Sequence, residues 1–408
     1  METSRLTAVV LTGATALVLT IPGASAQSTG PVARYDMRAG TVTGASPMSG
    51  ASAMSMIFGG GAKNTAQHEL YLRLGSSQGP AKGAPKADHF MPPNARLGKS
   101  VALETPREDP VPDALPQRPK GRLLIFWGCG EHVGKGQPVV IDFAKIAAGQ
   151  VPPDLWNSTV LRDWGPTLAN SKTFGRWPSG DGKSVRGDSS LPGLHRIAGN
   201  YSPEISFTLT KDFMAPLAVQ TADLPGGATR ANWGGIPDVT GYLLGLFGGK
   251  QDANGEMGEM IMWSSSASRQ FGNGLSDWLS PSQVAALVKD GTVLAPTVTS
   301  CTIPAEVNKA AGDFRFGSLT AFGPEEDFAY PPRPADPKAA WNLEWTARIR
   351  HRSTTSWMQM EGMATGMGSA MADEPQAQPK PECKKKKKGL GGALGGVLSG
   401  ALGTGDGC

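Results

Sequence analysis

Short apolar or alternating segments, each bounded by Pro, Gly or Ser, recur along most of this chain and restrict it to a fold built mainly from strands. Residues 67–74 alternate polar and apolar side chains, which places Leu70, Leu72 and Leu74 on one buried face. Residues 122–127 are continuously apolar apart from their first position, as expected for a central strand covered on both sides. Further predicted strands are residues 139–143, 205–209, 241–247, 259–263, 297–303 and 314–322.

These strands fall into two blocks, which we interpret as two antiparallel β-sandwich domains with long loops. One short helix is predicted near 281–290, because Ser280 and Pro281 suit its cap and first position and Gly291 suits its end. The predicted divisions are a signal peptide (1–26), the first sandwich (31–147), an aromatic-rich connector (148–202), the second sandwich with its Pro-rich extension (203–357), a flexible spacer (358–381) and a flexible Lys/Gly-rich tail (382–408).

One pattern in the second block resembles a known family. Trp233, a Pro-containing turn and Tyr242 in the next strand resemble the second and third strands of fibronectin type III sandwiches, over about residues 203–330. The resemblance implies a sandwich in which these two rings pack together. It implies no activity and no functional residue, since sandwiches of this type host unrelated functions. The chain as a whole is similar to exported proteins of Gram-negative bacteria.

The first 26 residues predict export. Arg5 precedes a weakly apolar run, residues 6–21, which is followed by Pro22–Gly23 and by Ala24, Ser25 and Ala26. A basic start, an apolar stretch and a small-x-small end are typical of a secretory signal, and cleavage is expected after Ala26. A retained membrane anchor is the alternative, but the run is shorter than the roughly 20 residues a span needs.

Export changes what the four cysteines can do. In an oxidising compartment they can form disulfides, with three possible pairings. The simplest scheme pairs the two cysteines in strand-like contexts with each other and the two at the tail with each other; unpaired buried thiols in the first pair are the alternative. The candidates are Cys129, Cys301, Cys383 and Cys408.

Residues 128–136, a Gly-rich segment, do not match a phosphate-binding loop. Five residues separate Gly128 from Gly134, where that motif has four, and Gly136 stands where a hydroxyl would hold magnesium. Cys129 and His132 supply one thiol and one imidazole with no third metal ligand nearby. A Gly-rich turn after a buried strand is the better interpretation.

Three further polar groupings also predict no chemistry. Ser264–Ser265–Ser266 with distant His195 and Asp277 lack a nucleophile elbow. Residues 181–188 lack oxygen ligands at the third and fifth positions of a calcium loop, so they indicate a solvated turn. Residues 325–327 could hold an acid of raised pKa, but the flanking prolines favour an exposed loop. We therefore expect no catalytic residue, no metal site and no cofactor.

The connector is rich in aromatic residues and poor in periodic pattern. Its rings could stack on sugar rings if they are exposed, or they could pin a long loop onto the sandwiches. As candidate ligand-binding residues we take Trp156, Trp164, Phe174, Trp177 and Tyr201.

The tail is the most basic part of the chain. Residues 380–408 carry six Lys against two acidic residues, a net charge of +4 that equals the formal charge of the whole chain. Small residues at every fourth position resemble the glycine zippers of bacterial envelope proteins and suit membrane or self-association; docking to a partner protein and disorder without function are alternatives. The residues concerned are Lys384, Lys385, Lys386, Lys387, Lys388, Gly392, Gly396 and Gly400.

These features predict a non-enzymatic protein of the cell envelope, in the periplasm, at the cell surface or associated with a membrane. It is expected to act as a binding or structural module, attached by its tail to a membrane surface or an envelope protein, with a glycan as a candidate ligand. Because the net positive charge of the chain is confined to the tail and the rest is balanced, nucleic acid is not an expected partner. An exported hydrolase of envelope polysaccharide is the alternative.

Overall fold

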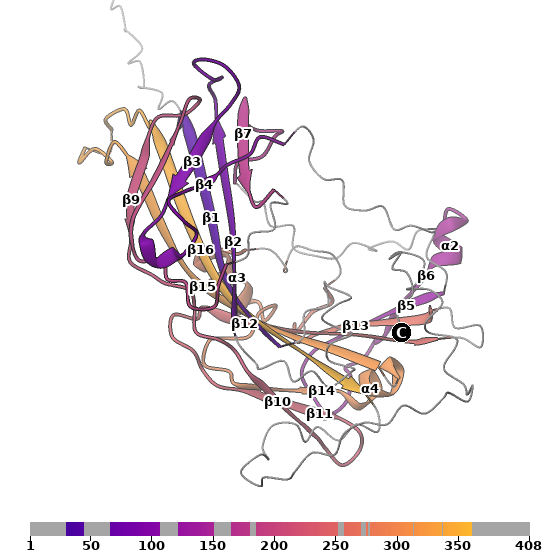
Figure 1. Cartoon of the computed structure of the whole chain (residues 1–408). Helices are drawn as coiled ribbons and strands as arrows, with labels where there is room; N and C mark the ends of the chain where they lie inside the picture. The colour runs from indigo at the N-terminus through magenta and orange to yellow at the C-terminus, as the bar shows by residue number, and fades with distance from the viewer. Residues whose placement is uncertain are drawn as a thin grey trace, which may run out of the picture. The chain divides into compact units, whose positions relative to one another are not determined.

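The computed structural model describes residues 30–44, 66–106, 121–150, 165–179, 185–251, 257–270, 275, 278–312, 314–336 and 338–360. The signal segment, residues 361–381 of the expected spacer, the Lys/Gly-rich tail with Cys383 and Cys408, and the rings of Trp156 and Trp164 lie outside these ranges. Residues 358–360, which were also expected in the flexible spacer, belong to a strand instead. Within them the protein is mainly β, as the sequence predicts (Figure 1).

The strands are β1 (Ala33–Gly44), β2 (Gln67–Ser76), β3 (Ala87–Phe90), β4 (Val101–Ala102), β5 (Arg122–Trp127), β6 (Val139–Asp142), β7 (Thr173–Trp177), β8 (Gly193–Gly199), β9 (Ile205–Leu209), β10 (Val219–Asp223), β11 (Thr229–Trp233), β12 (Gly241–Gln251), β13 (Met257–Ser264), β14 (Ser300–Ile303), β15 (Phe314–Tyr330) and β16 (Trp345–Met360). The helices are α2 (Phe143–Ala147), α3 (Pro281–Lys289) and α4 (Ala305–Ala311), with a 3₁₀ turn, η1 (Pro93–Ala95).

One long sheet organises the described residues. Its nine strands follow the order β6-β5-β13-β12-β15-β16-β1-β2-β7. A four-stranded sheet has the order β4-β3-β8-β9, and a three-stranded sheet the order β10-β11-β14. Most neighbours are antiparallel, but β1 runs parallel to β16 and β5 runs parallel to β13. The expected all-antiparallel pairing therefore does not hold at these two places.

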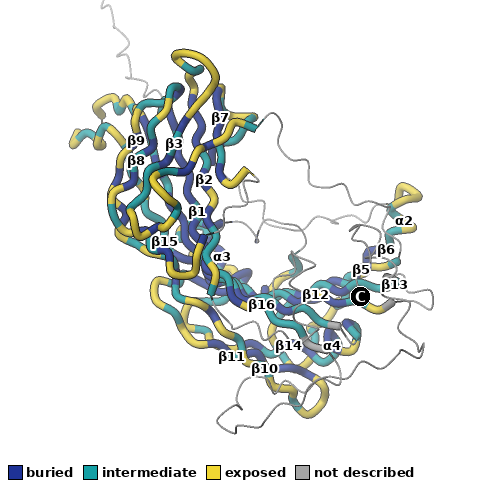
Figure 2. Tube along the Cα trace, viewed as in Figure 1, coloured by how far each residue is buried: buried dark blue, intermediate teal, exposed yellow. Residues whose placement is uncertain are grey.

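Two cores lie between the long sheet and the two smaller sheets. In the first, Tyr35 and Met37 of β1 pack with Leu72 and Leu74 of β2 and with Ile197 of β8. These side chains alternate along their strands, so a single face of each strand supplies the core. Figure 2 shows the buried residues along the lengths of β1 and β2.

The second core joins β12, β13 and β15 of the long sheet to the three-stranded sheet. Trp233 of β11 and Tyr242 of β12 meet there edge to face, with ring centroids 5.5 Å apart. Leu244 and Leu246 of β12 face the same core. The rings that carried the resemblance to fibronectin type III domains therefore do touch.

The sheets of the structure do not divide along the two sequence blocks that were predicted as separate sandwiches. Strands from 31–147 and from 203–357 share the nine-stranded sheet, where β5 pairs with β13 and β1 with β16. Alternation shows which face of a strand is buried but not which strand lies beside it, so a boundary at 148–202 does not separate the sheets.

The predicted helix is present as α3. The Ser280 hydroxyl accepts from the backbone N–H of Gln283, and the Gln283 side chain accepts from the N–H of Ser280, which forms a capping box. Val284 and Leu287 of α3 pack with Phe322 of β15, on the face of the long sheet opposite the second core. α2 and α4 were not predicted, because helices of five and seven residues show little periodicity.

Candidate functional site

The outward face of β1, β2, β15 and β16 is densely charged. On β1 and β16 the core-facing residues alternate with residues that are mostly charged. The parallel register places Arg38 beside Arg350 and Asp36 beside Arg348. Across β2, β1, β16 and β15 this face carries six arginines and four carboxylates: Arg34, Arg38, Arg73, Arg348, Arg350, Arg352, Asp36, Glu69, Glu325 and Asp327. The face therefore has an excess of positive charge.

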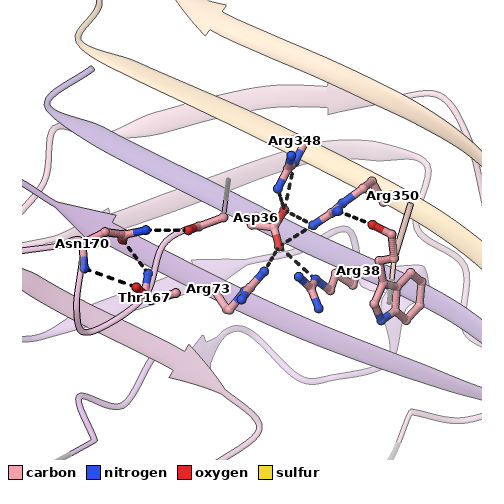
Figure 3. A network of polar contacts seen from close by, with 9 residues as sticks. Asp36, Arg38, Arg73, Thr167, Asn170, Arg348 and Arg350 are labelled. Carbon is pink, nitrogen blue, oxygen red and sulfur yellow. Dashed lines mark hydrogen bonds and ion pairs between the residues drawn. The ribbon is translucent and has the colours of Figure 1, made fainter. Parts of the chain in front are cut away.

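Asp36 is the centre of this face, and its side chain is 1% exposed (Figure 3). Its Oδ2 accepts from Arg73 Nη2 at 2.7 Å and from Arg38 Nε at 3.1 Å. Its Oδ1 accepts from Arg348 Nε at 3.1 Å and from Arg350 Nη2 at 3.0 Å. One carboxylate thus holds four guanidinium groups from three adjacent strands, which are fixed in place by charged hydrogen bonds.

The surrounding arginines decide the charge of Asp36. Burial by itself would raise the pKa of this carboxyl, but the attraction of Arg350, Arg73, Arg38 and Arg348 outweighs burial and lowers the pKa to about 2. Asp36 is therefore ionised throughout the physiological pH range. The neighbouring carboxyls Glu325 and Asp327 of β15 also interact with Arg348 and Arg350, so the cluster contains further negative charge besides Asp36.

Two glycines let neighbouring groups cross this face. Gly40 lies in register with Glu69 on one side and Arg352 on the other, and a Cβ at Gly40 would meet Glu69 Cγ at 2.5 Å. The Glu69–Arg352 ion pair, 2.8 Å between Oε1 and Nη2, can form because no side chain stands between them. A Cβ at Gly75 would meet Pro166 Cβ at 2.5 Å, so Gly75 allows the 165–171 segment to pack over β2.

The same segment holds Arg34. Arg34 Nη2 donates to the Asn170 carbonyl oxygen and to Asn170 Oδ1, each at 2.9 Å. Asn170 Oδ1 also accepts from the N–H of Thr167, and Asn170 Nδ2 donates to the Gly165 carbonyl oxygen (Figure 3). This network ties the 165–171 segment to β1 beside the Asp36 cluster.

A groove of about 590 Å³ opens over the outward face of β1, β16 and β15. Its charged lining consists of two arginines, Arg34 and Arg348, and two carboxylates, Asp36 and Asp327. Two small residues, Thr346 and Ala329, also line it and lie in register with each other. Pro166 and Trp341 complete its sides. The Trp341 ring is fixed by a hydrogen bond from Nε1 to the Pro331 carbonyl oxygen at 2.9 Å. The volume is in the range of small-ligand sites.

A second acidic pair lies at the edge of the Asp36 cluster. Burial, followed by the charge of Asp327, raises the pKa of the half-buried Glu325 to about 6. Both residues belong to β15 and pair with β16, so the expected exposed loop at 325–327 was wrong. The loop was predicted from the two flanking prolines, but neither interrupts the strand pairing of 325–327. Pro324 lies where the β15–β16 register shifts, and Pro331 follows the end of β15.

The connector aromatics that the structure describes are buried. Phe174 is 3%, Trp177 3% and Tyr201 1% exposed, and Trp177 and Tyr201 belong to the first core. Rings enclosed to this degree cannot stack on a sugar unless the core opens, so the expected ligand role does not fit these three residues. Trp156 and Trp164 lie outside the described residues.

The Gly-rich segment at 128–136 is a connection tied down by a disulfide. Cys129 and Cys301 are bonded, with Cα atoms 5.3 Å apart, which links the end of β5 to β14. His132 Nδ1 contacts Glu306 Oε1 at 3.0 Å at the surface. Among the described residues, no group of three or more His, Cys, Asp or Glu side chains is placed to hold a metal ion.

His195 belongs to a buried polar chain and not to a serine triad. Its Nε2 donates to the Leu191 carbonyl oxygen at 2.8 Å, so its Nδ1 accepts from His89 Nε2 at 3.0 Å. His89 Nδ1 in turn accepts from the Tyr35 hydroxyl at 2.7 Å. Burial lowers the pKa of both histidines, with the neighbouring imidazole adding to the effect at His89. With both rings neutral, every donor and acceptor in this hydrogen-bonded series has a partner, so the series is a structural element of the first core.

Sequence reasoning missed every arginine of this site. The signal was present in residues 345–350, where Trp, Ala and Ile alternate with Thr, Arg and Arg, and again in residues 33–38. Both segments are period-2 strands with a charged outer face.

In the ranges described, no helix has both the length and the apolar character that crossing a bilayer requires.

Comparisons with known proteins assign no family to this chain. A scan against protein-family models matches no family, and a search of curated proteins finds no match. A search of solved structures returns the Fcho1 Mu homology domain of Danio rerio with a bound Eps15 peptide, at 8% identity over 82% of this chain and 99% of that chain, with a TM-score of 0.22. A TM-score this low supports no conclusion about fold or function.

Proposed function

We propose that this chain is an exported binding module of the cell envelope, without catalytic activity, whose ligand site is the groove over β1, β15 and β16. The observation that carries the proposal is the set of four guanidinium groups held over one buried carboxylate directly beside the groove. Their positive charge suits an anionic ligand, and their hydrogen bonds to Asp36 orient them before any ligand arrives.

Two further features support the location. The pattern of residues 1–26 is that of a secretory signal, and the Cys129–Cys301 bond suits an oxidising compartment. The Lys/Gly-rich tail, residues 382–408, supplies the attachment to a membrane surface or envelope protein. Deleting residues 380–408 should move the protein from the membrane fraction to the soluble fraction, and unchanged fractionation would remove the tail from the proposal.

Calorimetric titration of the full chain tests the ligand site. At low ionic strength, citrate and tri-galacturonate serve as anionic probes. Arg34→Gln removes a cation of the groove, and Ala329→Phe fills its small floor; each should weaken binding at least tenfold. Arg196→Gln makes the same charge change on β8, where Arg196 pairs with Glu204, and should leave binding within twofold. If neither probe binds, the groove is not an anion site.

An exported polysaccharide hydrolase is the second candidate, and the raised pKa of Glu325 favours it, since a general acid needs such a shift. However, Glu325 and Asp327 lie two positions apart on the single strand β15, whereas the two carboxyls of a glycosidase flank the scissile bond about 5–9.5 Å apart. Release of reducing sugar from an envelope polysaccharide, abolished by Glu325→Gln, would favour the hydrolase over the binding module.

A further inference from the structure

We infer that the groove takes an oligosaccharide that carries carboxylates, that is, a chain of uronic acid residues. The inference rests on the proposed function, because it assigns a ligand class to the same site. It follows from three properties of the groove: where its cations lie, what separates them, and which aromatic ring borders them.

The cations are spaced along two rows of the sheet. Arg34 lies in register with Thr346, and Arg348 lies in register with Asp36 on the neighbouring row. Each guanidinium is held by hydrogen bonds, Arg34 to Asn170 and Arg348 to Asp36. The positive charges of the groove are therefore separate and fixed, which suits a ligand with carboxylates at intervals better than one compact anion.

Two acids, Asp36 and Asp327, line the groove beside these cations. Asp327 lies directly across from Arg348 in the β15–β16 register and lines the groove. A carboxylate here repels a densely charged ligand such as a polyphosphate, but it accepts hydrogen bonds from hydroxyl groups. The Thr346 hydroxyl, on the floor beside Ala329, can also donate or accept. A ligand that offers both carboxylates and hydroxyls satisfies this lining.

The aromatic side of the groove is Trp341. Its indole is fixed through the bond from Nε1 to Pro331, and Arg333 lies 5.7 Å from the ring centroid. An immobilised indole at the border of a polar groove provides a flat apolar surface that matches the apolar face of a sugar ring. The volume of about 590 Å³ accommodates more than a single small ion.

Titration calorimetry of the full chain with three probes tests the inference: tri-galacturonate, a neutral galactose trisaccharide and citrate. Tri-galacturonate should bind at least tenfold more tightly than either of the others. Trp341→Ala should weaken tri-galacturonate at least tenfold and leave citrate within twofold, and Trp341→Phe should restore most of the affinity. The denaturation midpoint of each variant establishes that it is folded.

The outcomes separate this inference from the proposed function. Citrate binding as tightly as tri-galacturonate, with both weakened by Ala329→Phe, would overturn the saccharide inference and retain an anion site. Equal affinity for the neutral and the acidic trisaccharide would overturn the role of the arginines. Absence of binding by all three probes would overturn both proposals.

Discussion

At the scale of single residues, Asp36 holds the candidate site together. Its carboxylate is buried and accepts hydrogen bonds from four arginines on β1, β2 and β16. Arg350 is the most enclosed of them, at 3% exposure, and also donates to the Trp278 carbonyl oxygen. Arg352 lies 4.0 Å from the centroid of the Trp278 ring, so the segment before α3 is held against the same cluster.

Replacing Asp36 with Asn should therefore destabilise the protein strongly. The change leaves four arginines without their shared counter-charge, and removing one partner of a buried ion pair costs about 3–5 kcal/mol. Urea denaturation would measure the loss in the free energy of unfolding. Asp188→Asn is the control, since Asp188 is 49% exposed and pairs with Arg186 and Arg96 at the surface, where such pairs contribute up to about 1 kcal/mol. Equal losses in the two variants would mean that the cluster does not stabilise the fold.

His351 of β16 gives stability a defined pH dependence. Burial, partly offset by Glu326, Asp212 and Asp238, lowers the pKa of His351 from 6.5 to about 4. The native state therefore binds fewer protons than the unfolded state in this window, and its stability falls as the pH falls from 6.5 to 4. The shift corresponds to about 3 kcal/mol. Urea denaturation at pH 7 and pH 4 should show this loss in the wild type, and His351→Leu should reduce it; an unchanged pH dependence in the variant would contradict the assignment.

At the scale of elements, the strands with an apolar run or clean alternation were predictable. The bounds of β5 and β9 match the prediction, and the capped helix α3 lies where Ser280, Pro281 and Gly291 placed it. The apolar face of β1 consists partly of Ala33 and Ala39, and its outer face of Arg, Asp and Gly, so its alternation is weak in hydropathy. Short strands such as β3 and β4 form because their neighbours supply the pairing, which local sequence does not encode.

The candidate site was not predictable for a related reason. Asp36 and Arg350 are 314 positions apart in sequence and meet because β1 pairs with β16 in parallel. A charged outer face on one strand indicates solvent exposure when that strand is considered alone. Only the pairing of four such strands turns the charges into a cluster with a buried centre. By contrast, the Cys129–Cys301 pairing was predictable, because few alternatives existed.

The disulfide links β5 to β14 and should contribute measurably to stability. Its 172-residue separation gives about 5 kcal/mol as the loop-closure value, and native disulfides typically contribute about 2–5 kcal/mol. The double variant Cys129→Ala/Cys301→Ala should lose that amount in urea denaturation. Dithiothreitol should lower the wild type to the level of the variant and leave the variant unchanged. A wild type insensitive to reductant, equal in stability to the variant, would contradict this role.

At the scale of the whole molecule, β16 connects the two parts of the long sheet. It lies between β15 and β1, so without it the nine strands divide into β6-β5-β13-β12-β15 and β1-β2-β7. Both cores draw on strands of the long sheet, and the first core includes Trp345, Ala347 and Ile349 of β16 itself. The integrity of the fold therefore depends on residues near position 360.

Truncation tests this dependence. A chain that ends at residue 344 lacks β16 and should lose cooperative unfolding, as followed by tryptophan fluorescence in urea. A chain that ends at residue 363 keeps every described strand, and it should unfold like the full-length protein. Cooperative unfolding of the shorter chain would contradict this dependence, because the twelve residues of β1 that pair with β16 would then not need that strand.

The parallel pairing of β1 with β16 also sets an order on maturation. Ala33 and Trp345 are partners, so the strand made first waits for a neighbour that emerges from the ribosome more than three hundred residues later. During that interval one edge of β1 presents unpaired backbone groups, which are a template for erroneous association. The exposed edge of β1 is therefore open to erroneous pairing until β16 is available to cover it.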